Sequence, residues 1–261
     1  MNQPSAIGFF DSGVGGLSVL RHALDCVGGI PLLYVADSAY APYGGREQAQ
    51  VIARSRAIAR FLVEQGAQAI VVACNTATAI AIEALRAEFT VPVIGMEPAI
   101  KPAAGISRSG RVAVLATAGT LRSARYARLV SDHGRQVTVF ERACRHWVEA
   151  VEEGDLDSPR VRDLVHAELQ PLHAAGVDTY VLGCTHFPFL TGAIRQVVGD
   201  EVQLVDPGPA VIEQLRRRLQ LETQQAQRSP VRLFSSADPA HLSRSARNLI
   251  DLDADALRLG L

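Results

Sequence analysis

Two cysteines each follow a short apolar run that is typical of a buried strand. Cys74 stands in Ala73-Cys74-Asn75-Thr76 after the run 69–72, and Cys184 stands in Gly183-Cys184-Thr185-His186 after the run 179–182. In a parallel sheet, residues just past the strand ends line the ligand-binding edge. Amide groups at the start of a following helix would stabilise a thiolate there. The motifs therefore predict two poised thiols that face one substrate from opposite sides.

Three chemistries compete for these cysteines. His186 could act as the base for a nucleophilic Cys184, but Cys74 would then have no role. Cys74, Cys184 and His186 could together bind zinc, although no local ligand spacing supports a metal site. An acid–base pair uses both thiols, because inversion of a carbon stereocentre requires proton removal on one face and proton delivery on the other.

The segment Asp11-Ser12-Gly13-Val14-Gly15-Gly16 follows the apolar run 6–10 and precedes a helix that we expect to begin near Leu17. Its glycines allow close backbone approach, and free amides at a helix start bind anions. The spacing differs from the dinucleotide-binding pattern, and Asp11 would repel a pyrophosphate. A small carboxylate ligand is therefore expected rather than a nucleotide. Pro42-Tyr43-Gly44 follows the second strand and forms another loop at the same edge.

Compact apolar runs alternate with segments of helical composition, which predicts an α/β fold with parallel sheets. Helices are expected over 47–65, 76–88 and 210–219. The expected strands cover residues 6–10, 32–36, 69–73, 93–94, 112–116, 137–140, 179–182, 202–205 and 231–234.

The proline-rich segment 97–102 interrupts this alternation before a new strand begins. Residues 112–120 echo 7–15, and residues 181–185 echo 71–75. We therefore expect two similar doubly wound parallel-sheet domains related by a pseudo-twofold, with the active site in the cleft between them. Their expected bounds are 1–97 plus 208–261, with a returning C-terminal segment, and 98–207. The polar stretch 220–229 is expected to be an exposed loop.

Composition excludes several classes of protein. The chain has 261 residues, 26 basic and 27 acidic, so charge gives no reason to expect nucleic acid or a membrane surface as a partner. The run Arg216-Arg217-Arg218 is interpreted as a solvated helix face. No apolar stretch approaches the roughly 20 residues that span a bilayer. Four scattered cysteines and no signal-like start favour the cytoplasm, with Cys26 and Cys144 as buried small hydrophobic side chains.

From Ile7 to about Leu219 the chain resembles the cofactor-independent glutamate racemases of the aspartate/glutamate racemase superfamily. The residues that carry the resemblance are Asp11-Ser12-Gly13-Val14-Gly15-Gly16, Pro42-Tyr43-Gly44, Val72-Ala73-Cys74-Asn75-Thr76-Ala77, Pro98-Ala99-Ile100-Lys101-Pro102, Leu115-Ala116-Thr117 and Leu182-Gly183-Cys184-Thr185-His186-Phe187-Pro188.

This resemblance implies that Cys74 and Cys184 are the acid–base thiols, with Asp11 assisting the first and His186 the second. Cys74 would take the proton from the D-substrate and Cys184 the proton from the L-substrate. No cofactor and no metal are implied. The implied substrate-binding residues are Asp11, Ser12, Pro42, Tyr43, Gly44, Cys74, Asn75, Thr76, Thr117, Cys184, Thr185 and His186, and Asp37 is a weaker candidate.

The family's second cysteine is also served by a glutamate, which aligns here with Glu152. Glu149 and Glu153 are rival carboxylates on the same helical segment, and all three could simply face solvent. The preceding Arg145-His146-Trp147 departs from the proline and small apolar residues that the family pattern leads us to expect.

The implied activity is the interconversion of L-glutamate and D-glutamate, which supplies D-glutamate for peptidoglycan in a bacterial cytoplasm. A homodimer is compatible with the resemblance, and domain closure on the substrate is expected to exclude water. Two alternatives stay open: an aspartate racemase of the same superfamily, and a non-catalytic sensor that binds an amino acid.

Overall fold

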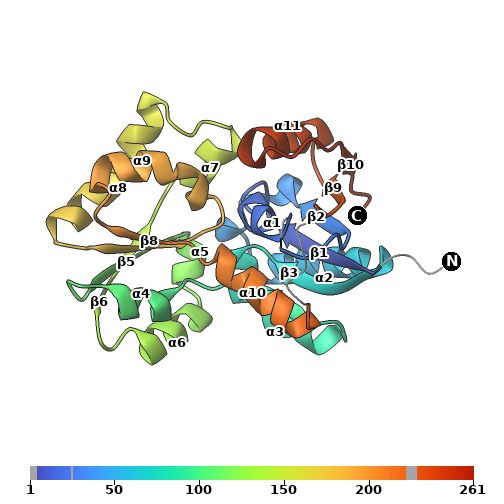
Figure 1. Ribbon diagram of the computed structural model, residues 1–261, viewed down its shortest axis with the longest axis horizontal. Coiled ribbons are helices and arrows are strands. Elements are labelled where there is room, and N and C mark those ends of the chain that lie inside the picture. Colours follow the sequence, from blue (N-terminus) through green and yellow to red (C-terminus); the bar gives the residue numbers. More distant parts are fainter. Residues whose placement is uncertain (1–4, 25, 222–227) are drawn as a thin grey trace. The chain divides into compact units, whose positions relative to one another are not determined.

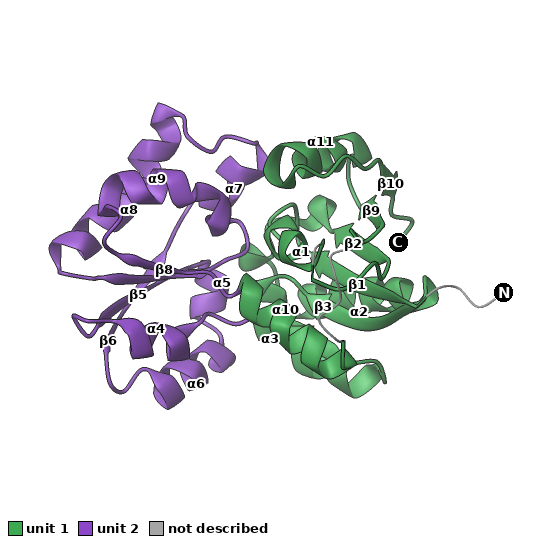
Figure 2. Cartoon of the chain, in the orientation of Figure 1, with its two compact units in different colours: residues 1–96, 208–261 green, residues 97–207 purple. Residues whose placement is uncertain are grey.

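The computed structural model describes residues 5–24, 26–221 and 228–261. The chain forms two compact units, residues 1–96 with 208–261 and residues 97–207, which are coloured separately in Figure 2. Most of the stretch expected to be an exposed loop, 220–229, falls in 222–227 and so lies outside the described residues. Within the described ranges no helix is long and apolar enough to cross a membrane.

The first unit is built on a six-stranded sheet whose pairings are all parallel. Its strands, in spatial order, are β10 (Ala256–Arg258), β9 (Val231–Ser235), β2 (Leu32–Ala36), β1 (Ala6–Asp11), β3 (Ala67–Val72) and β4 (Val93–Gly95). Every residue of β1 and β2 is buried, because helices cover both faces of a parallel sheet.

The helices of the first unit divide between the two faces of its sheet. They are α1 (Leu17–Leu24), α2 (Gln48–Glu64), α3 (Asn75–Glu88), α10 (Gly208–Leu219) and α11 (Pro239–Ile250). The chain reverses direction across the sheet after β2, so right-handed crossovers place α1 and α2 on opposite faces. α2 packs beside α3, while α1 packs beside α10 and α11 (Figure 1). Two short 3-10 turns, η1 (Ser38–Tyr40) and η2 (Tyr43–Gly45), connect β2 to α2.

The second unit contains a four-stranded parallel sheet in the order β6 (Thr138–Ala143), β5 (Arg111–Ala116), β7 (Thr179–Gly183) and β8 (Gln203–Val205). Its helices are α4 (Ile100–Ile106), α5 (Ala118–Leu121), α6 (Ala124–His133), α7 (Trp147–Glu152), α8 (Pro159–Ala174) and α9 (Thr191–Val198), and the 3-10 turn η3 (Phe187–Leu190) precedes α9. α4 packs beside α6, and α8 packs beside α9.

In each sheet, the chain places its second strand on one side of the first strand and its third strand on the other. The direction in which strands are added therefore reverses, and this reversal point lies between β1 and β3 in the first unit and between β5 and β7 in the second. Ligands of doubly wound sheets bind at this reversal, beyond the carboxyl ends of the strands. Asp11 ends β1 and Cys74 follows β3, whereas Thr117 follows β5 and Cys184 follows β7.

The predicted fold class, two parallel-sheet α/β domains, is confirmed. Strand β10 and helix α4 are among the elements for which no bounds were predicted. Strand β10 was missed because it has only three residues and is largely exposed. Helix α4 was missed because Pro102 is within it; proline is tolerated in the first helical turn, where amide groups need no partner within the helix.

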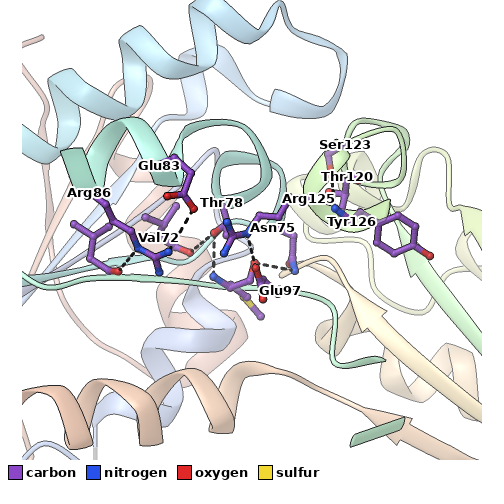
Figure 3. Close-up of polar contacts among 12 residues, drawn as sticks. Val72, Asn75, Thr78, Glu83, Arg86, Glu97, Thr120, Ser123, Arg125 and Tyr126 are labelled. Carbon is purple, nitrogen blue, oxygen red and sulfur yellow. Dashed lines mark hydrogen bonds and ion pairs between the residues drawn. The ribbon is translucent and has the colours of Figure 1, made fainter. Parts of the chain in front are cut away.

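The Thr78 hydroxyl joins three segments at the end of β3. It donates a hydrogen bond to the carbonyl of Val72 at 3.2 Å and accepts one from the amide of Met96 at 3.0 Å. Figure 3 shows Thr78, on α3, pointing toward Val72. Both bonds are buried, so the hydroxyl fixes α3 against β3 and against the chain that leaves β4.

We expect Thr78→Val to destabilise the first unit by about 1–3 kcal/mol, because the buried Met96 amide loses its acceptor. Urea unfolding followed by circular dichroism measures the change, and hydrogen exchange of the Met96 amide localises it. Thr78→Ser keeps the hydroxyl and should recover most of the loss. The exposed strand residue Thr138 provides a control, Thr138→Val, which should stay within about 0.5 kcal/mol of wild type. An equal effect of both valine variants would contradict this role of Thr78.

Candidate functional site

Cys74 lies at the junction of β3 and α3, where its side chain caps the helix. The Sγ atom accepts a hydrogen bond from the amide of Ala77 at 3.4 Å and donates one to the Ser12 hydroxyl at 3.9 Å. The residue is 5% exposed. A helix-capping sulfur in this position is stabilised as a thiolate by the orphan amides of the first turn.

The Asp11 carboxylate is anchored by the loop that follows β1. Its Oδ1 atom accepts hydrogen bonds from the Gly13 amide at 2.7 Å and from the Ser12 hydroxyl at 3.3 Å. Asp11 is therefore linked to Cys74 through Ser12. The carboxylate is fully buried, and these two donors compensate part of the cost of removing it from water.

Gly16 allows this loop to approach the end of β3. A Cβ atom at position 16 would lie 2.7 Å from Cβ of Asp11, 2.9 Å from the Tyr34 hydroxyl and 3.1 Å from the Ala73 carbonyl oxygen. The Tyr34 hydroxyl in turn donates to the Gly13 carbonyl at 2.7 Å. A side chain at position 16 would therefore separate the Asp11 loop from the Cys74 segment.

The Pro42-Tyr43-Gly44 loop belongs to the same edge of the first sheet. Tyr43 is buried and its hydroxyl donates to the Asp37 carboxylate at 2.6 Å, whereas Pro42 is exposed and Gly44 is half-buried. Burial, followed by the Asp37 charge and this hydrogen bond, raises the pKa of Tyr43, so the phenol stays neutral and acts as a donor. Asn75 and Thr76, at the start of α3, are buried beside Cys74 in the sequence.

Cys184 lies at the end of a row of three interacting side chains within the second unit. Its Sγ atom lies 3.7 Å from Nδ1 of His186, and Nε2 of His186 lies 2.7 Å from Oε1 of Glu152. His186 is 2% exposed and the Glu152 side chain 18% exposed. Of the three candidate carboxylates, Glu152 is the one bonded to His186; Glu153 pairs with Arg160, and Glu149 is exposed.

The partners of His186 decide its charge. Burial lowers the pKa of His186, but the hydrogen bonds to Cys184 and Glu152 and the negative charges of both groups raise it by more. The net pKa lies above the ordinary value, so the imidazolium is favoured at neutral pH. A charged imidazolium therefore lies beside the Cys184 sulfur, whereas the start of a helix lies beside Cys74.

Trp147 orients the helix that carries Glu152. Its ring packs edge-to-face on Phe187, with ring centroids 4.9 Å apart, and Phe187 follows His186 directly in the chain. Trp147 is almost fully buried, while Arg145 and His146 are exposed. The unusual Arg145-His146-Trp147 therefore places its two polar residues in solvent. Sequence analysis missed the Trp147–Phe187 contact because the two residues are far apart in the chain.

Two expectations about the cysteines were wrong. Cys26 is exposed, because it lies in the turn region after α1 rather than on a packed face. Cys184 does not precede an α-helix directly, since the short turn η3 comes first and α9 begins only at Thr191. Cys144 is buried, as expected, and burial, followed by the charges of Glu168 and Cys184, raises the pKa of its thiol.

Thr117 and Thr185 complete the sequence-predicted set in the second unit. The Thr117 hydroxyl caps α5 by accepting the Thr120 amide at 3.2 Å, and Thr185 is buried next to Cys184 in the chain. Among the residues that the structure describes, no group of three or more histidine, cysteine, aspartate or glutamate side chains is arranged to hold a metal ion. The described residues thus form two sites, one around Cys74 in the first unit and one around Cys184 in the second.

Comparison with known proteins gives a consistent family match. The model of the Asp/Glu/Hydantoin racemase family matches residues 17–215. A glutamate racemase of Methylococcus capsulatus is 52% identical over 91% of this chain and 88% of its own length.

Solved structures agree with the sequence relatives. A glutamate racemase isoform of Bacillus anthracis has a TM-score of 0.88 at 29% identity, covering 99% of this chain and 98% of its own. The Escherichia coli glutamate racemase, solved in complex with L-glutamate and the activator UDP-MurNAc-Ala, has a TM-score of 0.83 at 31% identity over 98% of both chains.

The His186–Glu152 pair predicts a pH-dependent stabilisation. The native pKa of His186 is raised, so its contribution to stability is complete below the unfolded pKa of about 6.5 and is lost as the pH rises through the native value. We expect Glu152→Gln to lower the pKa of His186 and to destabilise the protein more at pH 6 than at pH 9. NMR titration of the imidazole and urea unfolding at the two pH values measure these effects, with the other histidines as internal controls. An unchanged His186 titration in Glu152→Gln would contradict the assignment.

Proposed function

We propose that this chain, which belongs to the Asp/Glu/Hydantoin racemase family, interconverts L-glutamate and D-glutamate by proton transfer through Cys74 and Cys184. The observation that carries the proposal is the matched placement of the two thiols. Each follows the third strand of its own sheet, at the chain reversal where doubly wound sheets bind ligands, and each has bonded polar helpers.

The proposed reaction has two proton transfers. One thiolate removes the proton from Cα, and the electron pair of the C–H bond moves into the α-carboxylate to give a planar enediolate. The opposite thiol then delivers its proton to the other face of Cα, which regenerates a carboxylate and leaves the second sulfur as the thiolate. Cys74 removes the proton from the D-substrate and Cys184 removes it from the L-substrate. Each cysteine is therefore the base in one direction and the acid in the other.

The α-proton is a much weaker acid than a thiol, so the site must stabilise the enediolate and keep the attacking thiolate poorly solvated. Around Cys74, the Ser12 hydroxyl and the Ala77 amide hold the sulfur, while Asp11 orients Ser12. Around Cys184, Glu152 holds the His186 imidazolium next to the sulfur. The helpers of the two thiols therefore differ in charge.

The substrate and the cellular role follow from the same proposal. Glutamate is preferred over aspartate because the curated relative with 52% identity is a glutamate racemase, and because the Escherichia coli relative was solved with L-glutamate. The thiols supply the acid and the base, so the reaction needs no cofactor. The product D-glutamate would serve peptidoglycan synthesis in the cytoplasm.

A racemisation assay in deuterated water tests the proposal. Wild-type protein should convert either glutamate enantiomer into the racemate and incorporate deuterium at Cα, followed by circular dichroism and proton NMR. Cys74→Ala and Cys184→Ala should each reduce racemisation by at least about 1,000-fold, because each removes an acid–base group. Cys26→Ala, which changes an exposed cysteine, should keep full activity.

Two outcomes would reject the proposed function. Glutamate binding without exchange or racemisation would indicate a non-catalytic sensor. Faster turnover of aspartate than of glutamate would identify an aspartate racemase.

Cofactor independence has its own test. Racemisation should be unchanged after dialysis against a chelator and after treatment with borohydride, which reduces the imine that pyridoxal phosphate forms with lysine. A pyridoxal-dependent amino-acid racemase treated in parallel should lose its activity. Loss of more than half of the activity here would show that a metal or a carbonyl cofactor takes part.

A further inference from the structure

A buried carboxylate outside the cysteine motifs connects helix α2 to the Tyr43 loop. Asp37 follows β2 and is fully buried. Arg54, on α2, binds this carboxylate through two guanidinium nitrogens: Nε donates to Oδ2 at 3.0 Å and Nη2 donates to Oδ1 at 2.7 Å. The Tyr43 hydroxyl donates to the same Oδ2 atom at 2.6 Å. One carboxylate therefore joins the helix and the loop.

Arg54 is itself held in a fixed orientation. Its guanidinium lies over the ring of Tyr40, with Cζ 4.2 Å from the ring centroid, and its side chain is only 13% exposed. The hydrogen bond to Asp37 raises the pKa of Arg54, so the guanidinium stays charged. A bidentate pair of this kind is directional as well as strong, which suits a role in placing the loop.

The carboxylate also lies close to the Cys74 site. The amide of Asp37 donates to the carbonyl of Asp11 at 2.9 Å, and Tyr43 belongs to the same buried cluster of side chains as Cys74. The first sheet therefore presents two buried carboxylates, Asp11 and Asp37, at the edge where a thiolate and an anionic substrate are expected. Arg54 neutralises the second of them.

We propose that Arg54 is a positioning residue for the half-reaction of Cys74: through Asp37 it fixes the Tyr43–Gly44 loop beside the thiol and cancels a negative charge that would repel the substrate. This proposal rests on the proposed function. Arg54 does not touch the reacting atoms, and its effect passes through Asp37 and Tyr43.

Loss of the guanidinium has two consequences, both on the Cys74 side. The Asp37 carboxylate would be buried without its cation, a state that is strongly disfavoured. It would then either take up a proton, which changes its hydrogen bond with Tyr43, or remain charged and repel the glutamate carboxylates. The Cys184 site, whose bonded partners belong to the second unit, would keep its geometry.

The test compares Arg54→Met with Arg56→Met. Arg56 lies on the same helix but pairs with Glu88 at the surface, so its replacement removes an arginine without disturbing Asp37. We expect Arg54→Met to lower kcat/KM for glutamate by about 10- to 100-fold, as misplacement of a binding loop commonly does. Arg56→Met should match wild type, and Arg54→Lys, which keeps the charge but not the fork, should fall between.

An isotope effect separates positioning from a general loss of stability. Slower proton transfer at Cys74 makes removal of the α-proton limiting for D-glutamate and makes delivery of the proton limiting for L-glutamate. The isotope effect on kcat/KM should therefore rise for 2-deutero-D-glutamate and fall for 2-deutero-L-glutamate in Arg54→Met. If this variant does not fold, Arg54→Lys should show the same asymmetry in weaker form.

The remaining outcomes are distinct. Equal isotope effects for the two enantiomers in a slowed Arg54 variant, or equal losses in Arg54→Met and Arg56→Met, would overturn the positioning role. So would wild-type kinetics in Arg54→Met. Absence of racemisation by the wild-type protein would instead reject the proposed function itself.

Discussion

Parallel strands end together at one edge of a sheet, and the polar groups that gather at this edge must be satisfied without the help of a neighbouring strand. Asp11 and Asp37 are both fully buried at such an edge. The first is held by amide and hydroxyl donors of its own loop, and the second by an arginine and a tyrosine from other segments. These bonds hold the carboxylates in place, and the shape of the Cys74 site depends on them.

The two thiol sites solve a similar electrostatic problem with different groups. Cys74 caps a helix of 14 residues, so backbone amides supply the positive end that favours a thiolate. Cys184 is followed only by a short 3-10 turn, and a charged imidazole takes the place of the helix. Burial lowers the pKa of this imidazole, and the hydrogen bonds to Cys184 and Glu152 raise it by more.

The parallel α/β fold could be predicted because strands buried on both faces read as continuous apolar runs, as in 6–10 and 179–182. Sequence motifs also located the residues around both cysteines, since each follows a strand directly. The bond between Arg54 and Asp37 could not be predicted in this way. An arginine in the middle of an amphipathic helix looks like any solvated residue until the helix is packed on its sheet. The same holds for Trp147, whose partner Phe187 lies 40 residues further along the chain.

The first unit is assembled from two separate stretches of chain, with 231–235 inserted beside β2 and 256–258 at the sheet edge. Ser236, just past β9, accepts a hydrogen bond from the Ala39 amide in the segment that leads to Tyr43. During synthesis, residues 97–207 are complete before these strands leave the ribosome. The second unit can therefore fold on the nascent chain, while β2 remains an edge strand that is paired only with β1. The Tyr43 loop therefore gains this support only after the whole of residues 97–207 has been synthesised, so the first unit is completed after the second has had time to fold.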